Sequence, residues 1–226
     1  MLQLSLPKDE WPRYVARQLE HFFPDGRMPE KDALFARAVD RALERVEHCF
    51  RHVALTAYNR EGATWFSHLH ADQYTVFLWF VSNEVWKLFE DDGIASRLFC
   101  LNKAINGIMC MYDAGMPDVF LILHGCGTVL GKAGYSDYFV CCHGCTVGAV
   151  YGEYPILGKG VAMAPYSTVV GGCRVGPCST IGTQALLRSR DLEGGTLYYR
   201  DLDTGRAMTR PVPDCWAQSY YDVPIL

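Results

Sequence analysis

The chain has 226 residues, of which half are hydrophobic and 20% are charged, and its net charge is −4. This composition predicts a globular protein of one large or two modest domains and excludes a disordered chain. No cluster of Lys and Arg resembles a nucleic-acid footprint, so we expect no nucleic-acid partner. The most apolar run, residues 74–86, is too short and too interrupted to cross a bilayer, so we expect no membrane association.

Ten cysteines occur, a number that suits a disulfide-rich protein. However, no apolar run precedes the first charged residues, so the sequence predicts no signal peptide. Cys141 and Cys142 are neighbours in the chain and cannot readily bridge each other. We therefore expect reduced thiols and a cytoplasmic protein.

The first half of the chain predicts four helices. Acidic residues before Trp11 and Pro12 indicate the start of the first helix, and the Pro-Asp-Gly sequence at 24–26 ends it. Residues 31–53 are amphipathic, which predicts a surface helix. Residues 71–89 are apolar nearly all round, which predicts a buried helix, and a fourth is expected over 96–111.

The second half of the chain has an apolar or aromatic residue at every sixth position, with one break. A period of six suits neither a helix nor an ordinary strand, but it suits a parallel β-helix, in which each hexad forms one side of a triangular coil. The repeated residue is then expected to point inward. The repeat residues are Leu123, Val129, Tyr135, Cys141, Val147, Leu157, Met163, Val169, Val175, Ile181 and Leu187.

The break in the repeat predicts a loop. Ten residues separate Val147 from Leu157, so residues 149–155 should leave the coil, and loops on a rigid scaffold often carry sites. After Leu187 we expect a strand at 196–199, a turn at 203–205 and an extended arm. The predicted organisation is a helical domain (1–114), a β-helix (115–190) that begins near Asp118, and a C-terminal arm (191–226).

Three segments resemble motifs of the hexapeptide-repeat acyltransferases, in particular serine acetyltransferase. Residues 123–131 resemble the motif that carries the catalytic histidine of the family, which falls on His124; residues 145–148 and 154–161 resemble the motifs on either side of its loop. The resemblance implies an α+β chain: an N-terminal α-helical domain followed by a left-handed parallel β-helix of hexapeptide repeats, with a C-terminal extended arm.

The resemblance also implies an acyl-CoA-dependent, acetyl-type transferase that acts on a hydroxyl or amine of a small metabolite. His124 would be the general base for direct attack on the thioester. Acetyl-CoA would be the co-substrate, without a metal, in a groove between the β-helices of a homotrimer, or of a dimer of trimers. The residues that fall near the coenzyme by position are Gly148, Ala149, Ala164 and Thr183.

Several acceptor-side residues depart from the family pattern. Met109 and Leu123 replace two aspartates, one of which orients the histidine, and Glu153-Tyr154 replaces the Arg-His that grips the serine carboxylate. A carboxylate beside Glu153 would be repelled, so we expect an acceptor other than free serine.

Other polar residues are assigned only with alternatives. Asp113 or Asp118 could orient His124, or either could be a solvated turn residue. Asp72 could reach the acceptor pocket or could cap a helix, and His143 could contact the acceptor or be structural.

The cysteines around His143 are too tightly spaced for a closed zinc site, so we expect no metal. The γ-type carbonic anhydrases share the β-helix but need three histidine ligands, and the coils supply only His124 and His143. Transfer of a bulkier acyl group is also open. The competing hypothesis is a non-catalytic binding or scaffold protein that kept the fold after losing the aspartates at positions 109 and 123.

Overall fold

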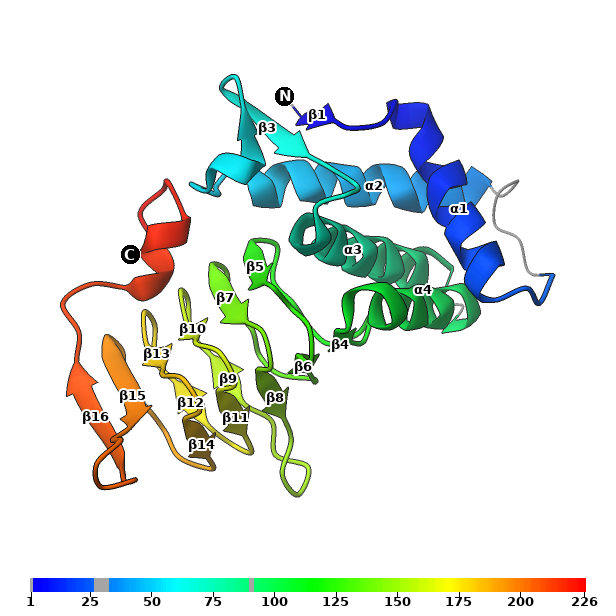
Figure 1. Cartoon of the computed structure of the whole chain (residues 1–226). Coiled ribbons are helices and arrows are strands. Elements are labelled where there is room, and N and C mark those ends of the chain that lie inside the picture. Colours follow the sequence, from blue (N-terminus) through cyan, green and yellow to red (C-terminus); the bar gives the residue numbers. More distant parts are fainter. Residues whose placement is uncertain (1, 27–32, 90–91) are drawn as a thin grey trace.

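The computed structural model describes residues 2–26, 33–89 and 92–226. It confirms the predicted fold class, because an N-terminal helical region is followed by a left-handed parallel β-helix (Figure 1). The first residues of the expected second helix, 31 and 32, lie outside the described part.

In its described residues, the helical region contains four α-helices and a small sheet. The sheet has the order β1-β3-β2, and the bounds of β3 (Ala63–Phe66) place it just before the buried helix. The fourth helix differs from its prediction of 96–111: it begins at Asp92 and ends at Asn106, because Gly107 adopts a left-handed φ of 69° there. The remaining elements are β1 (Leu2–Leu4), β2 (Asn59–Arg60), α1 (Trp11–Phe22), α2 (Ala33–Phe50), α3 (Ala71–Phe89) and α4 (Asp92–Asn106).

The β-helix consists of three parallel sheets whose strands come from successive coils. The first sheet contains β5 (Phe120–Leu123), β7 (Phe139–Cys142), β10 (Ala162–Met163), β13 (Thr180–Ile181) and β15 (Thr196–Arg200). The second contains β4 (Met109–Cys110), β6 (Val129–Leu130), β8 (Thr146–Gly148), β11 (Thr168–Val170) and β14 (Leu186–Arg188). The third contains β9 (Ile156–Leu157) and β12 (Arg174–Val175).

The register corrects two of the predicted inward residues. Ile122 pairs with Cys141, and Leu130 pairs with Val147, so these residues and not Leu123 and Val129 occupy the inward stacks of the first coil. The exposed fraction of Leu130 is 1% and that of Val129 is 36%. The first coil therefore has eight-residue spacing across the corner that contains His124. The next interval, from Leu130 to Tyr135, is five residues, so the strict period of six begins only at Tyr135.

The coil extends beyond both expected ends. Strand β4 already pairs with β6 at Met109, although a helix was expected there and the coil was expected to begin near Asp118. At the other end, β15 pairs with β13 and then forms a hairpin with β16 (Ala207–Pro211). The predicted strand at 196–199 is confirmed as part of β15.

The C-terminal segment packs back onto the molecule as a short helical turn, η4 (Trp216–Tyr220) (Figure 1). The backbone N–H of Ala54 donates to the carbonyl of Tyr220 at 2.9 Å, and the Tyr221 hydroxyl donates to the carbonyl of Phe139 at 3.3 Å. Ile225 is almost fully buried. The expected arm is thus a strap that joins the helical region to the coils.

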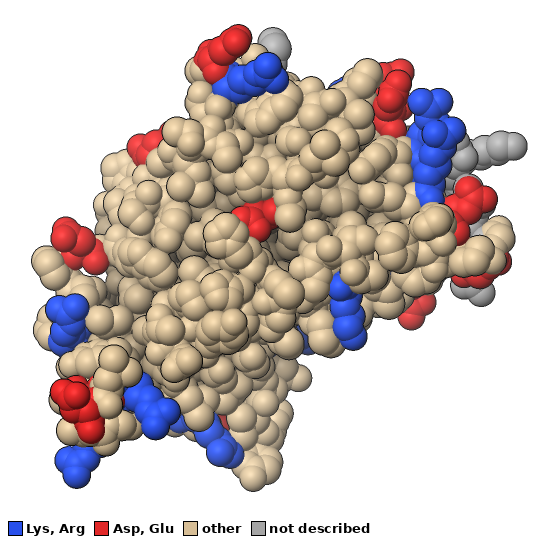
Figure 2. Space-filling model, in the orientation of Figure 1, with Lys and Arg blue, Asp and Glu red and all other residues tan. Residues whose placement is uncertain are grey.

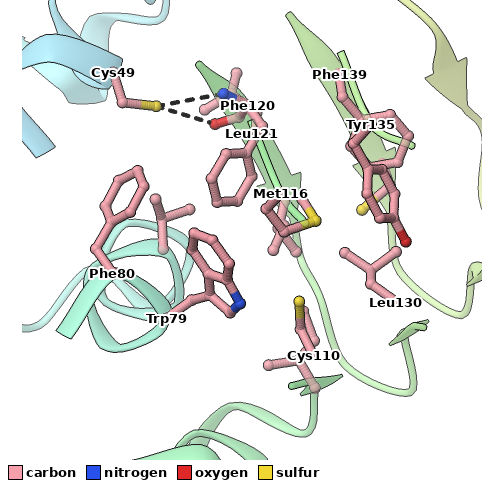
Figure 3. Close-up of a cluster of buried hydrophobic side chains, with 14 of the residues drawn as sticks. Cys49, Trp79, Phe80, Cys110, Met116, Phe120, Leu121, Leu130, Tyr135 and Phe139 are labelled. Atoms are coloured by element: carbon pink, nitrogen blue, oxygen red, sulfur yellow. Dashed lines mark hydrogen bonds between the residues drawn. The ribbon is translucent and has the colours of Figure 1, made fainter. Parts of the chain in front are cut away.

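An aromatic cluster joins α3 to the first coil (Figure 3). The Phe120 ring meets the Trp79 and Phe80 rings edge-on, with centroid distances of 5.7 and 5.6 Å. Cys49 of α2 donates through its Sγ to the carbonyl of Phe120 at 3.3 Å. Because packed interiors deform little, α3 and β5 form a single rigid unit.

All ten cysteines are free thiols. In the described ranges, we find no helix whose length and apolar character would suffice to cross a membrane.

The corrected register can be tested by a pair of substitutions in β6. Leu130→Ala should lower the free energy of unfolding by about 2–5 kcal/mol, because it leaves a cavity in the coil. Val129→Ala at the neighbouring, outward position should change it by about 0.5 kcal/mol or less. Denaturant unfolding measures both values, and a larger loss for Val129→Ala would contradict the register.

Candidate functional site

His124 follows strand β5 at a corner of the first coil. Its backbone has a φ of 55°, in the left-handed region, and its side chain is 84% exposed. Residues other than glycine seldom adopt this conformation, and such residues often occur at functional sites. The corner therefore presents the imidazole outward from the coil.

Asp72 of α3 contacts His124 in two ways. Its Oδ1 accepts a hydrogen bond from the backbone N–H of His124 at 2.8 Å, and its Oδ2 lies 3.6 Å from Nδ1 of the imidazole. The Asp72 side chain is 11% exposed, whereas that of His124 is 84% exposed. Asp72 thus holds the corner in place and sets a negative charge beside the imidazole, 52 residues away in the sequence.

His124 and Asp72 lie at the wall of a cavity of about 590 Å³, a size typical of small-molecule sites. Three separate parts of the chain form it: the segments on either side of the β2–β3 hairpin with the start of α3, the first two coils, and η4. The lining residues are Leu55, Ala57, Tyr58, Leu69, His70, Ala71, Asp72, Leu123, His124, Cys142 and Tyr220.

The sequence did not indicate two of the polar lining residues, Tyr58 and Tyr220. Tyr58 belongs to the turn η3 (Thr56–Tyr58) and is 2% exposed, and among the described residues its hydroxyl has no hydrogen-bond partner. Burial, and then the charge of Asp72, raise the pKa of Tyr58 well above its usual value. Tyr220 reaches the cavity only because the C-terminal strap folds back. No short-range pattern could have revealed either.

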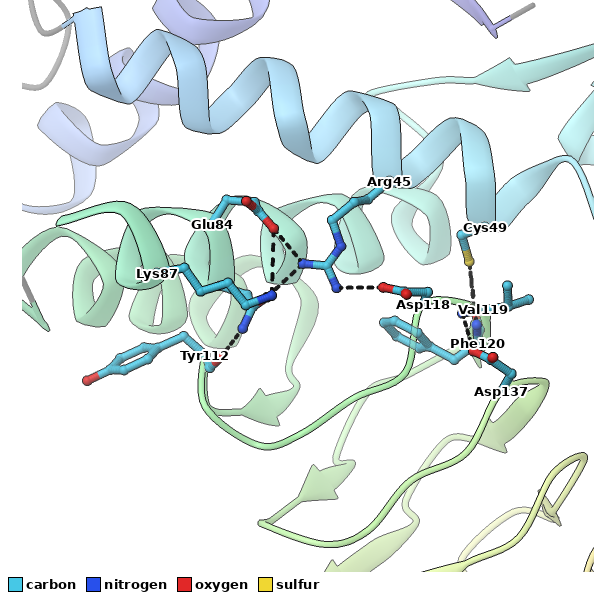
Figure 4. Close-up of polar contacts among 10 residues, drawn as sticks. Arg45, Cys49, Glu84, Lys87, Tyr112, Asp118, Val119, Phe120 and Asp137 are labelled. Carbon is cyan, nitrogen blue, oxygen red and sulfur yellow. Dashed lines mark hydrogen bonds and ion pairs between the residues drawn. The ribbon is translucent and has the colours of Figure 1, made fainter. Parts of the chain in front are cut away.

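Asp113 and Asp118, the candidates for orienting His124, have other partners. Asp113 lies 2.6 Å from Nζ of Lys132. Asp118 lies 3.3 Å from Arg45, which also donates to Glu84 of α3 at 2.9 Å (Figure 4). The described contacts of His124 include Asp72 and neither of these two carboxylates. Asp118 therefore helps to attach the helices to the first coil.

His143 and the four residues expected near the coenzyme lie along two edges of the β-helix. The register that pairs Leu123 with Cys142 places His143 one coil beyond His124, where its ring meets that of Tyr166 edge-on at 5.0 Å. The same register continues to Ala164 and Thr183 in later coils. Gly148 instead ends β8 and Ala149 follows it, at the next edge.

The loop after β8 projects away from the coil (Figure 1). Val150 and Glu153 exchange backbone hydrogen bonds of 3.1 and 3.0 Å, so the loop is a tight hairpin. Tyr151 and Tyr154 are 96% and 51% exposed. Neither Glu153 nor Tyr154 lines the cavity at His124, so within one chain the structure does not bring these expected acceptor residues to the histidine.

No group of three His, Cys, Asp or Glu side chains in the described part of the chain could hold a metal ion.

The thiol of Cys142 should report on the cavity. Burial raises its pKa to about 11, with Cys145 and Asp72 adding to the rise. Since only the thiolate reacts, iodoacetamide should modify Cys142 slowly at pH 8, and the rate should increase about tenfold per pH unit until the pH approaches that pKa. The exposed Cys126 should react faster than Cys142. Peptide mapping by mass spectrometry measures both rates, and equal labelling at pH 8 would argue against a buried Cys142.

No protein-family model and no curated sequence matches the chain. Solved structures do. Serine acetyltransferase from Neisseria gonorrhoeae superimposes with a TM-score of 0.66 at 15% identity, over 93% of this chain and 83% of that one. The enzyme from Brucella abortus strain S19 superimposes with a TM-score of 0.62 at 16% identity, over 92% of this chain and 99% of that one. The soybean serine acetyltransferase apoenzyme superimposes with a TM-score of 0.59 at 16% identity, over 88% of this chain and 84% of that one. The chain therefore has the fold of the serine acetyltransferases, in both its helical region and its hexapeptide-repeat β-helix.

Proposed function

We propose that this protein is an acyl-CoA-dependent acyltransferase, with acetyl as the transferred group and a hydroxyl or amine of a small metabolite as the acceptor. The observation that carries the proposal is the pairing of His124 with Asp72 at the wall of a ligand-sized cavity. A histidine held by a buried carboxylate is a common arrangement for proton transfer. The fold and the resemblance around His124 support the same reaction class.

In this proposal His124 acts as the general base. Its Nδ1 faces Asp72, which leaves Nε2 to accept the proton of the acceptor. The acceptor then attacks the thioester carbonyl, the carbon–sulfur bond breaks, and His124 returns the proton to the departing thiolate. An imidazole has an unperturbed pKa near neutrality and suits both transfers.

Asp72 takes the orienting role in this mechanism, in place of Asp113 or Asp118. Its Oδ2 lies 3.6 Å from Nδ1, longer than a hydrogen bond, and such contacts often tighten when substrate binds. The charge of Asp72 also stabilises the imidazolium that forms during the reaction. Asp72 thereby compensates for the departures at Met109 and Leu123.

The expected coenzyme residues have a shape that fits a thioester co-substrate, which would supply the activated acyl group. Gly148 has open space on its outer side, where even an added Cβ would approach only Val170, at 3.9 Å. Ala149 and Thr183 are exposed, and their small side chains leave the backbone accessible. Ala164 and Thr183 lie at one edge of the β-helix, and Gly148 and Ala149 lie at the next edge. In a groove between two copies of the chain, one copy would therefore contribute Ala164 and Thr183, and the other would contribute Gly148 and Ala149.

We therefore also propose a homotrimer, with a dimer of trimers as an alternative. Apolar side chains on the outward face of the second sheet support a contact between copies: Met109, Val129 and Leu186 are 38%, 36% and 54% exposed. Apolar residues gathered on one face favour association. Analytical ultracentrifugation distinguishes a monomer, a trimer and a hexamer.

Replacing the base should abolish turnover and preserve binding. His124→Asn suits the left-handed corner, since asparagine tolerates that conformation, and it should reduce kcat about 10²–10⁴-fold. The affinity for coenzyme A should stay within about twofold, because binding and proton transfer use different groups. Thiol release and isothermal titration measure these quantities. If the unaltered protein binds no coenzyme A at millimolar concentration, the chain is a scaffold and the proposal fails.

Two isosteric substitutions identify the orienting carboxylate. Asp72→Asn keeps an oxygen for the His124 N–H but removes the charge, so kcat should fall about 10–100-fold with little change in KM. Asp113→Asn, the matched control, should keep kcat within about twofold, since Asp113 contacts Lys132. The opposite result would assign the role to Asp113.

A further inference from the structure

The cavity at His124 is lined mainly by apolar side chains. Leu55, Leu69 and Leu123 contribute alkyl groups, Ala57 and Ala71 contribute methyl groups, and Cys142 contributes a thiol whose raised pKa keeps it neutral. No Lys or Arg is among the described residues that line it. An anionic acceptor would therefore lose its hydration here without a permanent cation to compensate for the loss, since the basic groups in the described wall are the imidazoles of His70 and His124.

The charges at the site are negative. Asp72 lies in the wall of the cavity, and the only charged side chain in the loop at 149–155 is that of Glu153. Whichever copy of the chain supplied this loop, it would bring no cation to the acceptor. In Figure 2, the surface between the helical region and the first coils shows acidic atoms surrounded by uncharged side chains.

One polar group in the cavity wall has no partner. The Tyr58 hydroxyl is buried and makes no hydrogen bond with any described residue. The Tyr58 ring is held edge-on by Phe50, with a centroid distance of 4.8 Å, so the hydroxyl has little freedom to find a partner elsewhere. A buried hydroxyl without a hydrogen bond is unfavourable, and a ligand that supplies a polar atom would relieve this.

Starting from the acyltransferase function proposed above, we propose that the acceptor is an alcohol or amine with an apolar body and no anionic group. Besides the nucleophile at His124, it carries a second polar atom that hydrogen-bonds to Tyr58. The lining selects against carboxylates and phosphates, and the Tyr58 hydroxyl distinguishes among the remaining apolar acceptors. Tyr58 is then a specificity-determining residue.

Matched acceptors test the exclusion of anions. Tyramine and tyrosine differ only in the carboxylate, and tyrosol and 4-hydroxyphenyllactate form the corresponding alcohol pair. With acetyl-CoA and the full-length protein, kcat/KM should be at least about tenfold higher for tyramine than for tyrosine, and likewise for tyrosol over its acid. Equal or reversed preference in both pairs would overturn the inference.

The role of Tyr58 is tested by removing one oxygen atom. Tyr58→Phe should raise KM about tenfold for tyramine, which has a second polar atom, and should leave KM unchanged for 2-phenylethylamine, which lacks one. The variant should unfold at the same or a higher temperature, because the lost hydroxyl has no partner in the free protein. An equal change for both amines, or a lower Tm, would indicate a structural role.

A substitution that should improve the use of an anionic acceptor complements the loss-of-function test at Tyr58. Leu69 lies at the rim of the cavity and is 81% exposed, so its replacement should not disturb folding. Leu69→Arg should raise kcat/KM for tyrosine relative to tyramine by about tenfold, whereas the uncharged control Leu69→Gln should not. No change with Leu69→Arg would contradict a selection based on charge.

Direct binding separates the failure of this inference from failure of the proposed function. Coenzyme A binding and His124-dependent thiol release, combined with a preference for tyrosine, would sustain the acyltransferase and overturn the acceptor class. If no thiol is released with any acceptor, isothermal titration of the protein with tyramine and with tyrosine, without coenzyme A, still tests the inferred selectivity. Binding of tyramine but not tyrosine, weakened by Tyr58→Phe, supports the inferred selectivity, and binding of neither overturns it.

Discussion

The packing of α3 against β5 is the contact on which the candidate site depends. Phe120 lies between Trp79 and Phe80 on one side and the coil interior on the other (Figure 3), and close-packed interiors of this kind resist deformation. Asp72 is in the first turn of α3, and His124 follows the last residue of β5. A rigid contact between these two elements therefore holds a carboxylate and an imidazole together. The hydrogen bond from His124 to Asp72 then keeps the corner in its left-handed conformation.

Two further attachments hold together the elements that form the cavity. Arg45 of α2 donates to Asn83 and Glu84 and pairs with Asp118, so it ties two helices to the segment that enters β5 (Figure 4). At the other side, the C-terminal strap hydrogen-bonds to Ala54 and Phe139 and brings Tyr220 to the cavity. The cavity thus exists only in the complete fold, because its walls come from the helical region, the coils and the tail.

The charge of the site explains how the serine acetyltransferase fold could serve a different acceptor. Where the family motif has Arg-His in its loop, this chain has Glu153-Tyr154, and the cavity at His124 has no Lys or Arg among its described lining residues. Under the proposed function, the same scaffold, with His124 as the base, would act on a molecule held by apolar contact and by a single hydroxyl. In such a site, the acceptor is selected both by the groups that the walls bind and by the charges that the walls leave uncompensated.

The sequence alone determined the helices and the β-helix, because their periods of 3.6 and six residues depend on local burial that repeats along the chain. It also singled out His124 and Asp72, but not their contact, since 52 residues separate them and no periodicity spans that distance. The phase of the first coil was misjudged by one residue at Leu123 and Val129, because both neighbours, Ile122 and Leu130, are equally apolar. Only the tertiary structure decided that Asp72, rather than Asp113 or Asp118, lies beside His124, and that Tyr58 and Tyr220 line the cavity. The physical reason is that a strand, a helix and a tail far apart in the chain meet only when the core between them is packed.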